Sequence, residues 1–185
     1  MELWGWGHKN TVDVNAKGQL HTVAEAVSAD YEATVINDAY TMDIDGIQTD
    51  GVAYWVAVMK NGHSMKDLVI MNIAGWVPTF GNTQIYEAVV GQTFSYASNG
   101  TPVVPTNDKS GITGGALGDF YVNDGSGNIT TIGGTGIIVG RFIFDNTPLS
   151  WHLDIIVPPN QTFMIRSDLA EKLNGSIHFY YKDNR

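Results

Sequence analysis

The chain has 185 residues, of which 43% are hydrophobic and only 16% charged, so its length fits one domain with one core and its composition excludes charge-driven disorder. Its 19 acidic and 10 basic residues give a net charge of −9, which opposes a surface that neutralises phosphates, and we expect no nucleic-acid partner. The absence of cysteine excludes disulfides, thiolate catalysis and cysteine-ligated zinc.

The chain opens on two tryptophans, Trp4 and Trp6, in a glycine-spaced and otherwise polar stretch where no core strand can be built around them. Two large rings left in water would each forgo about 1.5–3 kcal/mol. We therefore predict that Trp4, Trp6 and the nearby His8 form a protein interface, either with their own fold or with a neighbouring subunit. Residues 1–35 are predicted to form an N-terminal arm and residues 36–185 a single domain.

The opening residues also carry no basic start and no continuous apolar stretch of the kind that directs secretion. No apolar run in the chain approaches the ~20 residues that a membrane-spanning helix needs. We expect a protein made in the cytoplasm, with no membrane partner.

The region before residue 60 is acidic: from Gly18 to Met59 there are seven acidic residues and no lysine or arginine. A solvated face and a surface for a basic partner both explain this asymmetry. Within it, Asp43 and Asp45 precede Gly46 in a pattern that resembles the start of a calcium loop, but the third ligand position and the closing glutamate are missing. A strand that ends in an Asp-Gly turn is the alternative.

Turn-forming residues recur about every eight to twelve positions between short β-branched or aromatic runs, which favours an antiparallel sandwich or barrel. The pattern predicts that residues 52–59 and 67–76 pair as a hairpin through Asn61 and Gly62. It also predicts a hairpin of residues 119–122 with 129–132, inside a segment from Gly111 to Gly140 in which ten of thirty residues are glycine and which we interpret as long surface loops.

Further strands are predicted over residues 137–144, 153–157 and 175–181. Only two segments favour helix: residues 23–33, as a short helix or an extended arm, and residues 169–173, as one or two turns. The predicted fold is therefore all-β, an antiparallel β-sandwich of the jelly-roll kind with at most one or two short helices.

Residues that could carry chemistry are scattered. No two of the histidines have the close spacing of a metal-ligand pair, no phosphate-binding glycine motif is present, and no serine lies in a nucleophile elbow. We therefore predict no enzyme activity, no cofactor and no metal. Trp55, Trp76 and Trp151 lie in or beside predicted strands, and we expect them in the core.

Residues 12–24, VDVNAKGQLHTVA, resemble an opening found in structural proteins of tailed bacteriophage particles, where an acidic stretch and a strand ending in Lys-Asn follow. This chain repeats that order in residues 25–32, 39–44 and 54–61, and residues 100–103 and 155–165 look like further landmarks of the same group. The resemblance spans most of the chain and implies an oligomeric, virion-associated β-sandwich. The tryptophan-containing start, residues 3–8, has no place in that pattern.

Our leading hypothesis is a non-enzymatic virion protein, a capsid decoration or cement component that stabilises the shell through contacts with the major capsid protein or other virion proteins. We expect a homo-oligomer, with a trimer as the working assumption. The alternative is a tail or fibre module that binds a cell-surface glycan, with the loops between Gly111 and Gly140 as its rim. A hydrolase that uses two carboxylates is a third hypothesis, because 19 acidic residues ensure that some pair lies at a suitable distance.

Overall fold

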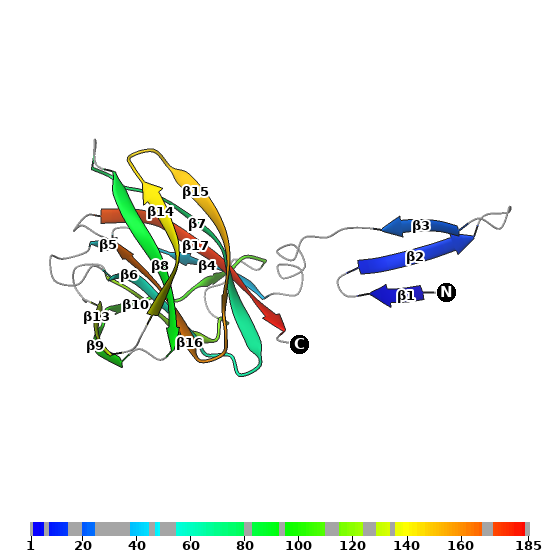
Figure 1. Cartoon of the computed structure of the whole chain (residues 1–185), viewed down its shortest axis with the longest axis horizontal. Helices are drawn as coiled ribbons and strands as arrows, with labels where there is room; N and C mark the ends of the chain where they lie inside the picture. Colours follow the sequence, from blue (N-terminus) through cyan, green and yellow to red (C-terminus); the bar gives the residue numbers. More distant parts are fainter. Residues whose placement is uncertain are drawn as a thin grey trace.

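The computed structural model describes residues 2–5, 8–14, 20–24, 38–44, 47–48, 55–79, 83–92, 95–109, 115–123, 129–133, 136–167 and 172–183. These residues form strands and turns, and among them no helix is long and apolar enough to cross a membrane. Two antiparallel sheets pack face to face as a sandwich (Figure 1). The predicted all-β sandwich is therefore confirmed.

The first sheet contains, in spatial order, β10 (Thr101–Pro102), β12 (Gly118–Val122), β6 (Trp55–Asn61), β16 (Gln161–Ser167), β8 (Gln84–Gln92) and β14 (Gly136–Phe144). The second sheet contains β11 (Thr106–Asn107), β4 (Ala39–Asp43), β17 (Lys172–Asp183), β7 (Lys66–Trp76) and β15 (Leu149–Val157), and β5 (Ile47–Gln48) also pairs with β17. The strands expected over residues 137–144, 153–157 and 175–181 are confirmed as parts of β14, β15 and β17.

The main strands pair like the two arms of one long hairpin that has been rolled up. β4 pairs with β17, β6 with β16, β7 with β15 and β8 with β14, and every pair is antiparallel. β14 and β15, which follow each other along the chain, are the edge strands of the two sheets on the same side of the sandwich (Figure 1).

Aromatic rings fill the space between the sheets. Phe179 of the second sheet stacks on Phe120 of the first, with ring centroids 5.4 Å apart, and so joins the two layers directly. Tyr86 stacks on Phe142 at 5.8 Å, and both side chains are fully buried. Because these rings alternate with outward-facing residues along their strands, burial of one face fixes the strand register.

The predicted hairpin of residues 52–59 with 67–76 is wrong. β6 lies in the first sheet and β7 in the second, so the chain crosses between the layers after Asn61. The buried Asn61 side chain stabilises this crossing, because its amide nitrogen donates to the backbone oxygens of Lys66 and Val157, each at 2.9 Å. Asn61 therefore caps a crossover and not a two-residue turn.

The second predicted hairpin is also wrong. β12 pairs with β6 and β10, whereas β13 (Ile129–Gly133) pairs with β9 (Ser95–Asn99). Asn123 extends the contact of β12 with β6, since its backbone N–H donates to the oxygen of Val56 at 3.0 Å. Pairing with distant strands that bury Phe120 and Val122 prevails over the local turn.

The structure shows strands in the described parts of both segments for which a helix was considered. Lys172 and Leu173 pair with Gln48 and Ile47, so the prediction of helical turns over residues 169–173 is wrong at these two residues; residues 169–171 lie outside the described residues. Leu173 is fully buried, and this burial favours the extended form. Residues 23–24 belong to a strand, and residues 25–33 lie outside the described residues.

Three strands precede the sandwich: β1 (Glu2–Gly5), β2 (His8–Val14) and β3 (Leu20–Ala24). They form one antiparallel sheet in chain order, and within the described residues they pair only with one another (Figure 1). The division into an arm over residues 1–35 and a domain over residues 36–185 stays a prediction.

Candidate functional site

The side of the sandwich formed by β14 and β15 has two neighbouring edge strands. Within the described residues, β14 pairs only with β8 and β15 only with β7, so one side of each strand has no ladder partner. A side-chain contact joins the two edges, because the indole N–H of Trp151 donates to the backbone oxygen of Ile143 at 3.1 Å. The edge strands of both sheets therefore lie together on this side of the molecule.

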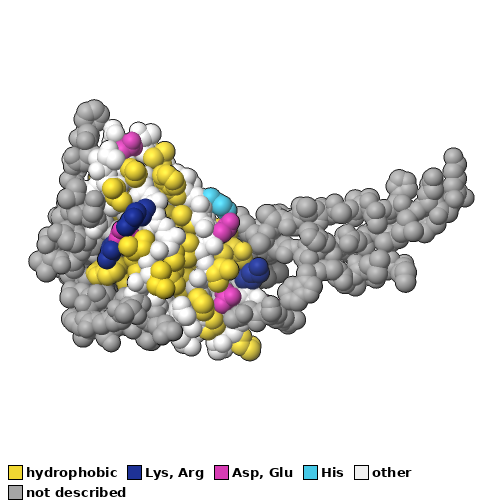
Figure 2. All heavy atoms as spheres, viewed as in Figure 1, with side chains coloured by type: hydrophobic (Ala, Val, Ile, Leu, Met, Phe, Trp, Pro, Cys, Tyr) yellow, Lys and Arg dark blue, Asp and Glu magenta, His cyan; other side chains and the backbone are white. Residues whose placement is uncertain are grey.

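Large apolar side chains are exposed along these two strands. Ile137, Ile138 and Val139 are consecutive in β14 and are 73%, 39% and 48% exposed. We call the exposed apolar side chains of β14 and β15, with Ile85 of the adjacent β8, the apolar edge: Ile85, Ile137, Ile138, Val139, Ile143, Leu149, Trp151 and Ile156. Figure 2 shows hydrophobic side chains gathered over these strands. Exposed apolar surface of this kind is typical of interaction sites.

The two edge strands differ in how they are protected. β15 carries a bulge between His152 and Ile155, where Asp154 adopts a positive φ of 49°. The Asp154 carboxylate lies 3.2 Å from Nε2 of His152. Charges and bulges prevent an edge strand from pairing with another chain. In β14 the register also shifts, between Ile138 and Gly140, but the residues from Gly136 to Gly140 carry no charge, so this segment lacks the charged side chains that protect β15.

Beside the apolar edge, Glu87 of β8 accepts hydrogen bonds from two arginines on its neighbouring strands. Nε of Arg141 lies 2.8 Å from Oε1, and Nε of Arg166 lies 2.6 Å from Oε2. These guanidinium groups, Arg141 first, hold the pKa of Glu87 below its ordinary value against the opposing effect of burial. The Arg166 guanidinium also lies 5.9 Å from the ring of Trp55. One row of this face thus carries a net positive charge on an acidic protein.

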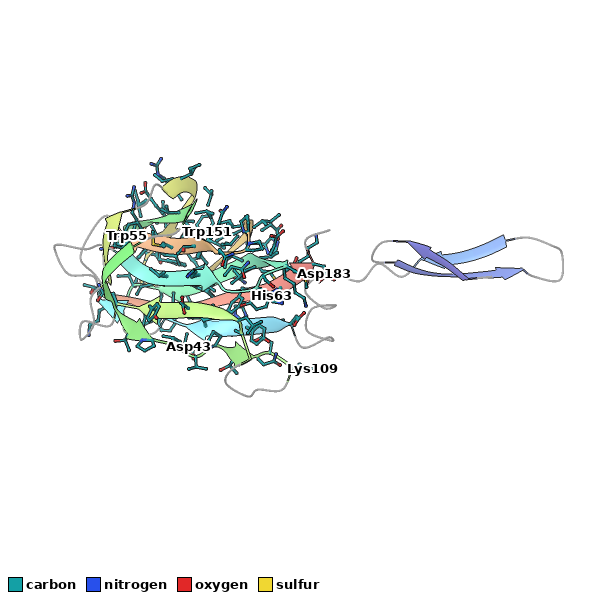
Figure 3. All side chains as sticks on the ribbon, turned by 90° about the horizontal axis from the view of Figure 1, so that it is seen from below. Asp43, Trp55, His63, Lys109, Trp151 and Asp183 are labelled. Atoms are coloured by element: carbon teal, nitrogen blue, oxygen red, sulfur yellow. The ribbon has the colours of Figure 1, made fainter. Side chains whose placement is uncertain are left out.

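The outer face of the second sheet has a shallow groove of about 420 Å³. Its floor is a row of short side chains that crosses four strands: Asp43 of β4 pairs with Ser176 of β17, Ser176 with Ala74 of β7, and Ala74 with Ser150 of β15. The remaining lining residues are Gly75, Trp76, Pro148, Leu149 and Gly175. Figure 3 labels Asp43 and Trp151, which lie on β4 and β15, the first and the last of the four strands that the groove crosses.

A polar chain of contacts lies in the next row of that face. Thr41 Oγ1 donates to Oδ1 of Asp108 at 2.6 Å and contacts Nδ1 of His178 at 2.9 Å. The other ring nitrogen of His178, Nε2, lies 3.4 Å from Oγ of Ser176. A serine, a histidine and a carboxylate are thus brought together. However, β17 is paired on both sides at Ser176, so the sheet engages the backbone there and leaves no free N–H of the kind that stabilises an oxyanion.

The predicted interface residues are placed only in part. Trp4 lies in β1 and His8 in β2, where Trp4 pairs with Lys9 and Gly5 with His8, and Trp6 lies outside the described residues. The structure therefore brings Trp4 and His8 to one end of the β1–β2 pair. Their role as an interface stays a prediction.

Other expectations need correction. Trp55, Trp76 and Trp151 do not lie in the core: Trp55 and Trp76 are half-buried, and Trp151 is 37% exposed. Asp43 pairs with Ser176 in the groove, whereas Asp45 lies outside the described residues, and the calcium hypothesis stays a prediction. In the described part of the chain, no group of three or more metal-ligating side chains is close enough to hold an ion.

The apolar edge escaped sequence reasoning because residues 137–139 carry the pattern of a buried strand. A signal was present: the glycines at 136 and 140 flank these residues within a segment too rich in glycine to bury a strand on both faces. Comparisons of the chain with protein-family models, with curated proteins and with solved structures found no match.

Proposed function

We propose that the protein is a non-enzymatic structural subunit that associates with further copies of itself through the apolar edge. The single observation that carries this proposal is the run of Ile137, Ile138 and Val139, three exposed and consecutive apolar residues on a strand that, among the described strands, pairs with β8 alone. Such a run is an aggregation hazard when left in water, so a working protein covers it.

A second copy of this chain is the occupant that fits best. A neighbouring copy supplies an edge strand of the same kind, which satisfies the unpaired backbone groups of β14 and buries the apolar side chains in one step. The net charge of −9 opposes association of two copies, but the arginines beside Glu87 reduce the negative charge near the contact. The trimer expected from the sequence is one closed arrangement of such contacts.

Within this class, we propose a decoration or cement protein of a tailed-bacteriophage capsid, located in the virion and bound to the major capsid protein or other virion proteins. Two observations support this proposal besides the edge. The nested pairing of β4 with β17 through β8 with β14 supports a jelly roll, an architecture that serves viral capsid and lectin domains. The resemblance of residues 12–24 to phage structural proteins is the second.

The test is the oligomeric state of the full-length protein, measured by light scattering after size-exclusion chromatography. We expect an oligomer that Ile137→Lys dissociates, because the substitution places a charge in the contact. Met65→Lys is the matched control: Met65 is 72% exposed, as Ile137 is 73% exposed, but it lies in the turn between β6 and β7. A monomeric wild-type protein, or equal effects of the two substitutions, contradicts self-association. Mass spectrometry of purified particles tests the virion location, where hundreds of copies indicate the shell and a handful the tail.

A further inference from the structure

We propose that the groove on the outer face of the second sheet binds a short, neutral oligosaccharide. This function goes beyond self-association, although the groove shares Leu149 with the apolar edge, and it uses other residues than the glycine-rich loops that the sequence suggested for a glycan site. The argument rests on which hydrogen-bonding atoms the groove presents, on its apolar walls and on its shape.

The hydroxyl of Ser176 faces the groove as a hydrogen-bond acceptor. The carboxylate of Asp108 can only accept, so the Thr41 hydroxyl donates its proton to Asp108 and must accept from Nδ1–H of His178. In the tautomer that carries its proton on Nδ1, Nε2 is the acceptor that faces the Ser176 hydroxyl at 3.4 Å. Only the lone pairs of Ser176 Oγ are left for a ligand.

Two other polar side chains of the groove also present acceptors. Ser150 Oγ donates to Oδ1 of Asn72 at 2.9 Å, which leaves its lone pairs for a ligand. The exposed side chain of Asp43 is a carboxylate and accepts only. Because Asp43, Ser150 and Ser176 are all acceptors, the ligand has to supply donors. Together with the negative charge of Asp43, this requirement disfavours phosphates and carboxylates and favours a molecule rich in hydroxyl groups.

The walls of the groove distinguish a sugar from a simple polyol or an ammonium ion. Trp76 provides a half-buried aromatic ring, and Pro148 and Leu149 provide further apolar surface. Aromatic rings pack against the C–H faces of a sugar ring while its hydroxyls bind at the edges. The floor crosses four strands, a span of about 14 Å at the usual strand spacing, which gives room for more than one sugar unit.

Two glycines let the strands beneath this floor lie close together. At Gly75 a Cβ atom would lie 2.8 Å from the backbone oxygen of Asn174, and at Gly175 it would collide with the backbone oxygen of Ala74. The strands approach each other closely here because neither position carries a side chain. Leu149 belongs both to the groove and to the apolar edge, so an oligomer built on that edge places several grooves on one particle and raises the avidity for a glycan surface.

The test uses the full-length protein on a printed array of neutral, amino and sialylated oligosaccharides, with titration of the neutral compounds that bind. We expect binding of neutral oligosaccharides, a loss of about tenfold or more in affinity for Trp76→Ala and for Asp43→Asn, and retention for Trp76→Tyr, which keeps an aromatic face. Asp183→Asn is the charge-matched control, because Asp183 lies exposed at the far end of β17. Thermal unfolding of each variant verifies that it is folded.

Several results would overturn the proposal. They are the absence of binding by folded wild-type protein, binding restricted to sialylated compounds, and neutral binding that survives both Trp76→Ala and Asp43→Asn. Binding of amino sugars or basic peptides that needs Asp43 but not Trp76 would identify a cation site instead. The monomer-forming Ile137→Lys variant should keep its affinity for a single soluble oligosaccharide, so failure of the assembly proposal and failure of this one are distinguishable.

Discussion

The indole N–H of Trp151 and the backbone oxygen of Ile143, 3.1 Å apart, connect the edge strands of the two sheets. Trp151 lies on β15 and Ile143 on β14, and the chain between them is the short connection that carries it from one layer to the other. An indole needs a partner for its single donor, and here it uses a backbone carbonyl group of the edge strand β14. The contact therefore holds the two halves of the apolar edge in one fixed arrangement.

Removal of this indole N–H should weaken the connection between β14 and β15 while an aromatic ring stays at position 151. We expect Trp151→Phe to lower the free energy of unfolding by about 0.5–1.5 kcal/mol, the usual net value of one hydrogen bond, in denaturant titrations followed by circular dichroism. Trp76→Phe makes the same chemical change at the last residue of β7 and serves as the control for ring size. Equal stability of wild type and Trp151→Phe would show that the contact contributes nothing.

Glu87 should make the protein sensitive to acid. Its pKa lies below the ordinary value, mainly because Arg141 donates to it, so the folded state holds the carboxylate proton more weakly than the unfolded state does. The resulting stabilisation is present above about pH 4.3, the ordinary glutamate value, and is lost as the pH falls through the depressed pKa. We expect the difference in unfolding free energy between wild type and Glu87→Gln to be largest near neutral pH and to shrink below pH ~4.

Asp119→Asn is the control for this pH dependence, because Asp119 is more exposed and its oxygen lies 3.7 Å from Nζ of Lys60. Exposed pairs of this kind contribute little. A difference between wild type and Glu87→Gln that stays constant over the acid range would contradict the assigned role of the two arginines.

Local patterns in the sequence were sufficient for several strands and for the class of fold. Residues 137–144 are β-branched or aromatic and end at an Asp-Asn-Thr-Pro turn, and both the strand and its end lie where these residues indicate. These local patterns did not predict which strands pair with each other. The Asn-Gly pair at positions 61–62 is a typical hairpin signal, yet the side chain of Asn61 binds Val157, a residue 96 positions away. Which strands pair depends on burial in the whole sandwich, which no local pattern contains.

The candidate sites were out of reach for the same reason. Thr41 and His178 are 137 positions apart, and they meet only because the first strand of the sandwich pairs with the last. Histidine spacing along the chain excludes a local ligand pair but says nothing of such long-range contacts. The apolar edge was hidden differently: an exposed Ile137 and a buried Phe144 are equally apolar, and only the strand order reveals which of them meets water.

Two buried tyrosines should limit stability in alkali. The pKa of Tyr181 is raised, chiefly by burial, and so is that of Tyr40. The folded state therefore keeps these phenolic protons at pH values where the unfolded chain loses them, and stability falls as the pH rises above about 10. We expect Tyr181→Phe to reduce this alkaline loss, measured as unfolding free energy against pH. At neutral pH the variant should be less stable, since the hydroxyl donates to the backbone oxygen of Leu117 at 2.7 Å. An unchanged alkaline profile would contradict this role of Tyr181.

The close approach of β7 and β17 at the groove floor predicts a sharp difference between two glycine substitutions. In Gly75→Ala the new Cβ atom would lie 2.8 Å from the backbone oxygen of Asn174, a contact that only movement of the strands can relieve. We expect a loss of about 1–3 kcal/mol in the free energy of unfolding. In Gly140→Ala the nearest atom to the new Cβ is that of Ala88, at 3.8 Å, an ordinary contact, and the change should stay within about 0.5 kcal/mol. Denaturant titration measures both, and equal costs would mean that the two strands separate more easily than their geometry implies.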